Sequence, residues 1–285
     1  MSESSLNNLA RNIRLRLAYD GTQYSGWQVQ PGRITIQGCL EQAIKSLTGE
    51  SVSVLSAGRT DAGVHALGQV ASFFTTSKIP AEKWRPALQT HLPPDIVILQ
   101  SDEVPPEFHA TFSAVSKRYR YVILNRLVSD PFVARYCWKI GQELNIELMQ
   151  QGANSLLGTH DFRSFESHWP NKATSVRTVH ELTLRRMSRW QLWGTEPVDD
   201  QVQAPPGDGE FICLEIEADG FLYNMVRTIT GTLVNVGRGS WDVQDVERVL
   251  KAQNRSVAGG TAPACGLFMV RVRYHEDNLA YRDPR

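Results

Sequence analysis

Two segments of the sequence share the same succession of a helical apolar stripe, a glycine and a strand pattern. From Ile36 to Leu47, apolar residues recur at helical spacing, with Thr35 as a candidate N-cap and Gly49 as a stop. From Ile146 to Leu157 the spacing recurs, and Gly158 follows. The two helix ends read SLTG and SLLG, a short echo between the halves of the chain. This succession predicts two related α+β halves.

Strand patterns flank both predicted helices. Alternating or continuous apolar runs predict strands at 13–19, 52–55, 69–75, 95–104, 119–123, 176–186, 211–218 and 267–274. Further helices are expected at 82–92, 222–236 and 243–252, the last behind Asp242 as an N-cap. We therefore expect an α+β fold of two related halves. Each half is expected to be a mainly antiparallel sheet with helices packed on one face.

A pair of prolines marks the expected boundary between the halves. The chain has 285 residues, enough for one large domain or for two of about 100–150 residues. Pro105 and Pro106 interrupt local structure, which predicts an N-terminal domain over 1–107 and a C-terminal domain over 108–285. The stretch near 190–210 is rich in proline and glycine and has no periodicity, so we expect an exposed insertion there between two strands.

The charges are unevenly distributed although the formal net charge is zero. Between residues 111 and 140 the only acid is Asp130, and the bases are Lys117, Arg118, Arg120, Arg126, Arg135 and Lys139. Between residues 191 and 219 there are eight acids and no Lys or Arg. A neutral protein can still present one basic face to a polyanion, and the basic stretch, with Arg11, Arg14 and Arg16, supplies candidate phosphate contacts. The alternative is that both runs are solvated surface.

The cysteines and the lengths of the apolar runs indicate in which cellular compartment the protein is expected. The four cysteines, Cys39, Cys137, Cys213 and Cys265, lie far apart and form no CxxC pair, so we expect them to be reduced and mostly buried. No apolar run reaches the length of a membrane span, and the first residues show no signal-peptide core. We therefore expect a cytoplasmic protein that does not enter a membrane.

The stretch SAGRTDAGVHALGQVASF, residues 56–73, places charged side chains at a turn between two predicted strands. Gly58 and Gly63 permit turns that other residues resist, so Asp61 is expected at the end of the sheet. An aspartate there can be a nucleophile, a general base, a metal ligand or a cap. His65 lies four residues on, which keeps a metal pair open. A turn aspartate that binds its own backbone is the plainer alternative.

Five segments of the chain resemble, in order, those of one known family. They are LAYDGTQYSGWQVQP…TIQGCLEQAI at 17–44, AGRTDAGVHALGQVASF at 57–73, FHATFSAVSKRYRYVI at 108–123, FLYNMVRTITGTLVNVGRG at 221–239 and TAPACGLFMVRV at 261–272. Together they cover most of the chain and resemble the tRNA pseudouridine synthase I family. The segments at 167–179 and 190–210 depart from the family's pattern.

The resemblance implies an isomerase that converts uridine to pseudouridine at tRNA positions 38, 39 and 40, in the anticodon arm. It implies these site residues: Asp61 as catalytic nucleophile, Arg59 beside it, Arg227 as the arginine that pairs with the aspartate, Tyr119 as the stacking tyrosine and Leu267 as the apolar wall. It also implies an active-site cleft between the two halves, no metal, no organic cofactor and a homodimer that binds tRNA across both subunits. Attack at the ribose C1′ and attack at the uracil C6 both remain open.

Two other functions remain as alternatives. A non-catalytic RNA-binding protein of the same fold would be expected to have lost Asp61 or Arg227, and both are present. A metal-dependent hydrolase would have to be built on Asp61, His65 and Asp161.

Overall fold

The computed structural model describes residues 10–167, 174–187 and 210–275. The chain divides into two compact units, one of Met1–Val115 with Arg271–Arg285, the other of Ser116–Val270. The units differ from the predicted ranges 1–107 and 108–285, because the first unit extends further and takes up the end of the chain. The predicted insertion near 190–210 lies outside the described residues, apart from Glu210.

Antiparallel strands form the sheet of the first unit. They are β1 (Arg11–Tyr19), β2 (Leu55–Ser56), β3 (His65–Thr75) and β4 (Ile96–Val104). Strand β1 pairs with β3 and with β4, and β2 pairs with β3. The expected strand at 52–55 is wrong except for its last residue, since regular pairing starts only at Leu55. Strand β3 starts at His65, four residues before the predicted position.

The first helix begins and ends as its sequence predicts. Helix α1 (Ile36–Thr48) begins after Thr35, whose Oγ1 accepts a hydrogen bond from the backbone N–H of Gly38 at 3.2 Å. It ends at Gly49, which has a positive φ of 78°. The predicted stripe is buried at Ile36, Leu40, Ala43 and Ile44.

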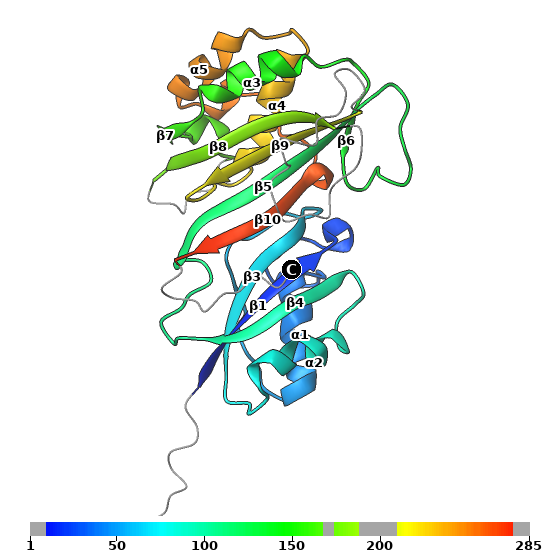
Figure 1. Cartoon of the computed structure of the whole chain (residues 1–285), viewed down its shortest axis with the longest axis vertical. Helices are drawn as coiled ribbons and strands as arrows, with labels where there is room; N and C mark the ends of the chain where they lie inside the picture. Colours follow the sequence, from blue (N-terminus) through cyan, green and yellow to red (C-terminus); the bar gives the residue numbers. More distant parts are fainter. Residues whose placement is uncertain (1–9, 168–173, 188–209, 276–285) are drawn as a thin grey trace, which may run out of the picture. The chain divides into compact units, whose positions relative to one another are not determined.

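The helices α1 and α2 lie on the same side of the first unit's strands (Figure 1). Helix α2 (Trp84–Gln89) is shorter than the predicted 82–92, because residues 81–83 form the 3-10 helix η3 (Ala81–Lys83). The buried indole of Trp84 meets the ring of Phe73 in β3 edge to face, with ring centroids 5.1 Å apart. This contact attaches the helix to the sheet.

A further set of paired strands lies in the second unit. Its strands are β5 (Ala114–Asn125, with two residues in the first unit), β6 (Trp138–Ile140), β7 (Gly158–Asp161), β8 (Val176–Met187) and β9 (Phe211–Ala218). The pairs β5–β9, β8–β9 and β7–β8 are antiparallel, whereas β5–β6 is parallel. The last strand, β10 (Leu267–Tyr274), begins in this unit and ends in the first.

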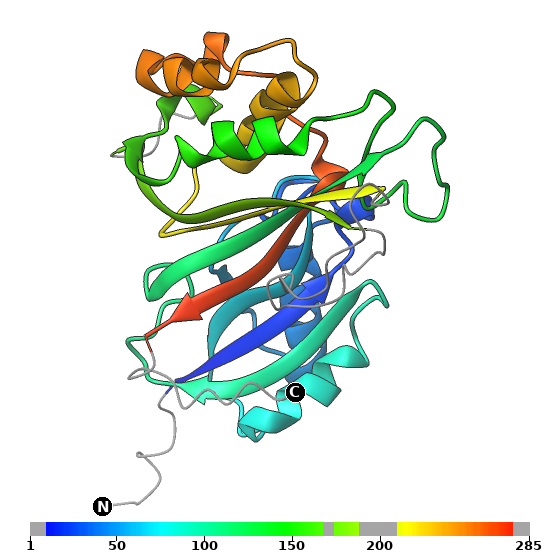
Figure 2. The ribbon, with the colours of Figure 1, turned by 45° about the horizontal axis from the view of Figure 1, so that its top comes forward.

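Three helices form a layer on one face of strands β8 and β9 (Figures 1 and 2). They are α3 (Ile146–Asn154), α4 (Met225–Gly237) and α5 (Val243–Ala252). Helix α5 and its Asp242 cap are as predicted. Helix α3 ends before the expected Leu157, because the N–H groups of residues 155–157 bond to carbonyls three residues back and do not continue the α-helical pattern. Helix α4 starts at Met225, three residues after the predicted start.

The observed architecture confirms the predicted α+β class, with mainly antiparallel strands and helices on one face. The four cysteines are free thiols, of which Cys137 and Cys213 are buried and Cys39 and Cys265 are partly exposed. None of the helices among the described residues has the length and apolarity that a membrane crossing requires.

Candidate active site

The Arg59–Asp61 stretch connects β2 to β3 in the first unit. The backbone N–H of Val64 donates to the carbonyl of Asp61 at 3.1 Å, which closes a turn over residues 61–64. Gly63 occupies the third position of that turn with φ 77°, a conformation that suits glycine. The turn leaves Asp61 half-buried and Arg59 exposed. Asp61 therefore lies in a turn between two strands, as the sequence predicted.

Thr60, between these two residues, is held at its carbonyl and at its hydroxyl. Its carbonyl accepts the backbone N–H of Trp27 at 2.9 Å, and its hydroxyl lies 2.8 Å from the hydroxyl of Tyr19. The side-chain amide of Gln69 reaches the same Tyr19 hydroxyl at 3.4 Å and the carbonyl of Gly58 at 2.7 Å. Burial raises the pKa of Tyr19 to about 12, so its hydroxyl keeps its proton at neutral pH. The backbone next to Asp61 is thus firmly anchored.

The glycine-rich loop after β1 packs against this turn. A Cβ on Gly26, whose φ is 90°, would lie 2.7 Å from the carbonyl oxygen of Thr60, so only glycine fits there. The indole of Trp27 is 2% exposed, and Tyr24 is buried with its hydroxyl donating to Asp95. The loop aromatics therefore belong to the core of their own unit and do not form an exposed stacking surface.

His65 is buried in the first unit and is bonded to the backbone there. It is 1% exposed, and its Nδ1 accepts the backbone N–H of Gly21 at 3.1 Å. Asp161 accepts the backbone N–H of Arg163 at 3.0 Å in the second unit. Within the described ranges, no group of three His, Cys, Asp or Glu residues is placed to hold a metal ion. The hydrolase alternative gains no support from the environment of His65.

Arg227 lies in the first turn of α4 in the second unit. Its Nε donates to the carbonyl of Ala262 at 2.7 Å, and its Nη1 donates to Oδ1 of Asn224 at 2.8 Å. The backbone N–H of Ala262 in turn donates to the carbonyl of Arg227 at 3.1 Å. Side chain and main chain of Arg227 are therefore both tied to one residue of the segment before β10.

That segment is held against α4 by close backbone packing. A Cβ on Gly231 would overlap the carbonyl oxygen of Gly260, and the N–H of Gly259 donates to Oγ1 of Thr232 at 3.0 Å. Arg255 donates to the carbonyl of Gly259 at 3.1 Å. These contacts fix the path of the chain that leads to Ala262.

Tyr119 and Leu267 are both buried in the second unit. The ring of Tyr119 in β5 meets Phe221 edge to face, with centroids 4.9 Å apart. Its neighbour on the same strand face, Tyr121, donates to the carbonyl of Pro263 at 2.7 Å. Tyr121 also packs on Gly266, where a Cβ would lie 2.7 Å from its ring. Leu267 follows directly, so the segment that ends at Leu267 is attached both to Arg227 and to β5.

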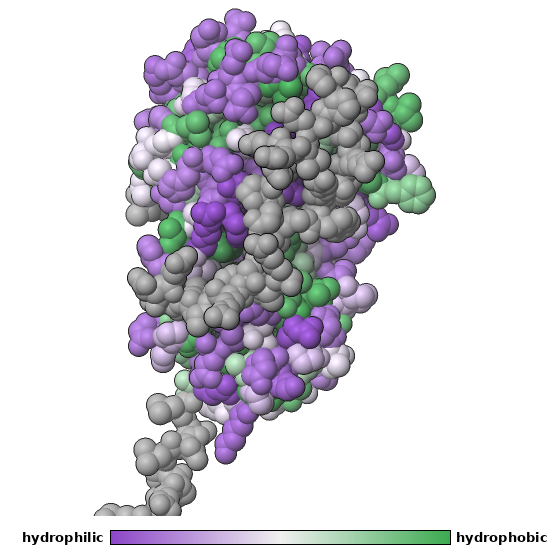
Figure 3. All heavy atoms as spheres, viewed as in Figure 1, coloured by the Kyte–Doolittle hydropathy of each residue, from purple (hydrophilic) through white to green (hydrophobic). Residues whose placement is uncertain are grey.

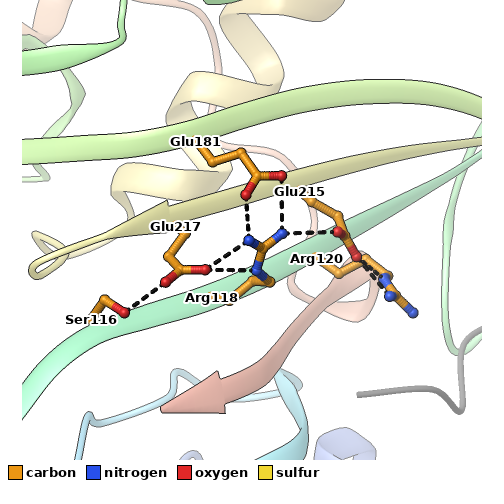
Figure 4. A network of polar contacts seen from close by, with 6 residues as sticks. All are labelled: Ser116, Arg118, Arg120, Glu181, Glu215 and Glu217. Carbon is orange, nitrogen blue, oxygen red and sulfur yellow. Dashed lines mark hydrogen bonds and ion pairs between the residues drawn. The ribbon is translucent and has the colours of Figure 1, made fainter. Parts of the chain in front are cut away.

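The basic and acidic stretches of the sequence meet in the second unit (Figure 4). Strand register places Arg118 opposite Glu217 and Arg120 opposite Glu215. Arg118 forms ion pairs with Glu217 at 2.7 Å, with Glu215 at 3.2 Å and with Glu181 of β8. Arg120 pairs with Glu215 at 2.6 Å.

This network corrects the interpretation of Arg118 and Arg120 as candidate phosphate contacts. The side chains of Arg118 and Arg120 are 4% and 1% exposed, so they neutralise buried glutamates. Arg126 pairs with Glu210 at 3.0 Å at the surface. In the first unit, Arg11 and Arg14 pair with Glu103 and Asp102. Among the described residues of the two runs, Arg118, Arg120, Glu215 and Glu217 are therefore buried partners of one another and are not solvated surface.

The structure thus places Arg59 and Asp61 in the first unit, and Tyr119, Arg227 and Leu267 in the second. The sequence prediction missed Asn224 and the Gly259–Ala262 segment, which orient Arg227. Two adjacent glycines at 259–260 were the available signal for a close backbone approach. Asn224 had no such signal, because it lies inside a stretch with helical periodicity.

A comparison with protein families and a comparison with individual known proteins agree with each other. A family model described as "tRNA pseudouridine synthase" matches residues 17–113 and 153–275. The chain is 46% identical over 264 residues to "tRNA pseudouridine synthase A" of Thermoanaerobacter sp. (strain X514), which covers 93% of this chain and 100% of that protein. It is 43% identical, with the same coverage, to the proteins of the same name from Acetivibrio thermocellus and Brevibacillus brevis.

Proposed function

The chain belongs to the tRNA pseudouridine synthase family, and from this membership we propose that it converts uridine to pseudouridine at positions 38, 39 and 40 of the tRNA anticodon arm. The conversion breaks the bond between the ribose C1′ and the uracil N1, and forms a bond between C1′ and C5. It leaves the composition of the nucleoside unchanged, so the enzyme is an isomerase. The C5 proton passes to solvent and N1 gains a proton.

We propose Asp61 as the nucleophile. The carboxylate either displaces the uracil from C1′ or adds to C6 before the C1′–N1 bond breaks, and in both cases the uracil then turns before the bond between C1′ and C5 forms. The support from the structure is the anchored turn, which holds the backbone beside Asp61 while the carboxylate itself stays half-buried. The exposed Arg59 lies two residues away, and we assign it to a phosphate or to the space left by the flipped base.

A nucleophilic carboxylate must stay ionised while bound substrate excludes water. Desolvation alone would favour the neutral acid. A guanidinium about 4 Å away offsets this by roughly 4 kcal/mol at an effective dielectric constant near 20. We assign that role to Arg227. The two bonds that already hold Arg227 support a fixed, directional guanidinium.

The substrate uridine is stacked in RNA and must be flipped out before it can react. We propose that Tyr119 stacks on the flipped base, which contributes roughly 1–3 kcal/mol, and that Leu267 forms the apolar wall. Both residues are buried at positions fixed by strand pairing and by the Pro263–Leu267 segment. The isomerisation transfers no net electrons, and we propose that it proceeds with neither a metal nor an organic cofactor.

We propose that the enzyme is a cytoplasmic homodimer that binds tRNA across both subunits. One surface that suits a protein contact is the connection between β5 and β6. Its large apolar side chains Leu127, Val128 and Phe132 are 79%, 69% and 89% exposed. Figure 3 shows hydrophobic residues at the edge of the molecule where this connection runs in Figure 1. Light scattering of wild type and Phe132→Asp tests this surface, and an unchanged dimer in the variant counts against it.

The observation that carries the proposal is the Arg59–Asp61 turn, anchored through Thr60, in a chain that matches the family over most of its length. The test uses unmodified tRNA tritiated at uridine C5. We expect label release with wild type, with or without chelator, and none with Asp61→Asn, which should still bind tRNA. Release at the wild-type rate by Asp61→Asn would overturn the catalytic assignment. Release that stops with chelator would favour a metal enzyme.

A further inference from the structure

The residue before α4 has a backbone conformation that is unusual at the start of a helix. Asn224 has φ 61° and ψ 6°, in the left-handed region. Among the described residues, the other non-glycine residue with positive φ is Gln253, which follows the last turn of α5. Helices often end in this conformation, whereas a residue that caps a helix start normally has an extended backbone. The conformation of Asn224 therefore requires an explanation other than capping.

The same residue type caps another helix of this unit in the ordinary way. Asn145, before α3, has φ −80° and ψ 102°, and its side chain accepts the backbone N–H of Leu148 at 3.0 Å. Asn224 makes no such bond to the first turn of α4. Its side chain therefore does not cap the helix, although an asparagine at this position can do so and stabilise the helix start.

The side chain of Asn224 instead connects two other side chains. Its Nδ2 donates to Oγ of Ser167 at 3.0 Å, and its Oδ1 accepts from Nη1 of Arg227 at 2.8 Å. The backbone N–H of Ser167 donates to the carbonyl of Tyr223 at 3.0 Å, which holds the serine beside Asn224. Because the amide nitrogen is bound to Ser167, the amide oxygen faces the arginine.

Two contacts at different nitrogens define the orientation of the Arg227 guanidinium. Nε is bound to the carbonyl of Ala262, and Nη1 is bound to Asn224. A planar group held at one point can still rotate, whereas a second point fixes its plane and therefore the directions of its other N–H groups. Asn224 supplies this second point from the residue before the helix.

We propose that Asn224 is a positioning residue for catalysis, whose left-handed backbone and side-chain amide together aim the guanidinium of Arg227 at the anionic carboxylate of the reaction. The inference rests on the proposed function, in which that carboxylate belongs to Asp61. The unusual backbone brings the amide to Arg227, at the expense of a normal cap.

The variant Asn224→Gly separates the backbone from the amide. Glycine adopts the left-handed conformation freely, so the fold is expected to keep its melting temperature. The amide oxygen is lost, and we expect kcat to fall by about 10–100-fold with little change in KM for tRNA, since misplacing one catalytic group has effects of this size. Gln253→Gly is the matched control: it makes the same change at the other positive-φ residue and should keep full activity.

The pH dependence of kcat/KM tests the positioning role of Asn224, because a residue with a purely structural role would leave that dependence unchanged. A misdirected guanidinium stabilises the carboxylate less, so the acid limb of kcat/KM should shift to higher pH in Asn224→Gly and stay in place in Gln253→Gly. Ser167→Ala should shift it in the same direction by less. Wild-type kcat and an unmoved acid limb in Asn224→Gly would overturn the inference. If Asp61→Asn and Arg227→Ala also remained active, the proposed function would fail instead, so the two failures are distinguishable.

Discussion

The carbonyl oxygen of Gly260 occupies the space where a side chain on Gly231 would begin. This close approach of a loop to the middle of α4 fixes the chain two residues before Ala262, which binds both the main chain and the side chain of Arg227. The position of the arginine thus depends on a glycine one helical turn further along α4.

The first prediction follows from this packing. Gly231→Ala should lower the free energy of unfolding by about 1–3 kcal/mol, because the new methyl group must displace backbone. Activity should fall as well, since the displaced loop carries Ala262. Chemical denaturation and label release measure the two effects. Gly260→Ala is the matched control, because a Cβ at Gly260 meets no atom within 4 Å.

The second prediction concerns the network of Arg118. Arg118→Met leaves Glu181, Glu215 and Glu217 without their shared cation, so we expect a loss of about 3–5 kcal/mol in the free energy of unfolding at pH 7. Arg126→Met, which breaks an ion pair at the surface, should cost less than about 1 kcal/mol. Equal costs for the two variants would contradict this account.

The third prediction uses the raised pKa of Tyr19. Its hydroxyl titrates at about 12 in the folded protein and at 10.0 when unperturbed, mainly because of burial. The folded state therefore keeps a proton that the unfolded state loses. This stability is complete below pH 10 and is lost as the pH rises toward 12. Tyr19→Phe should make the alkaline fall in stability shallower by on the order of 1 kcal/mol per pH unit. Identical slopes for variant and wild type would show that Tyr19 does not contribute.

The fourth prediction separates the ring of Tyr119 from its hydroxyl. If stacking on the flipped base is its role, Tyr119→Phe should retain most of the activity. Tyr119→Ala should raise KM for tRNA by roughly 5–150-fold, the equivalent of 1–3 kcal/mol of stacking. Steady-state kinetics with tritiated tRNA measure both variants. An inactive Tyr119→Phe would show instead that the hydroxyl takes part in the chemistry.

Much of the fold could be predicted because its signals are local. The caps Thr35 and Gly49 delimit α1, and Asp242 precedes α5, since each acts through bonds to its own helix. The strand predicted at 52–55 was wrong as far as Val54, because apolar residues in a short segment do not show that the segment pairs with another strand.

The sequence allowed us to predict which residues belong to the candidate site. It did not allow us to predict the contacts that these residues make. The basic residues around Arg118 resembled an RNA-binding surface because the sequence does not reveal that β5 pairs with β9. Once the register is known, Glu217 and Glu215 account for Arg118 and Arg120. The role of Asn224 depends on a backbone angle and a contact with Ser167, neither of which leaves a periodic signal.

The alternation of side chains along β9 limits where residues can be inserted into this chain or deleted from it. The residues of this strand alternate between Leu214 and Ile216, which are wholly buried on one face, and Glu215 and Glu217, which meet the arginines of β5 on the other. Inserting or deleting one residue here would turn the carboxylates toward the apolar layer and leave the guanidiniums facing methyl groups. Related chains should therefore vary in length in the connections between strands, while this strand evolves by substitution alone.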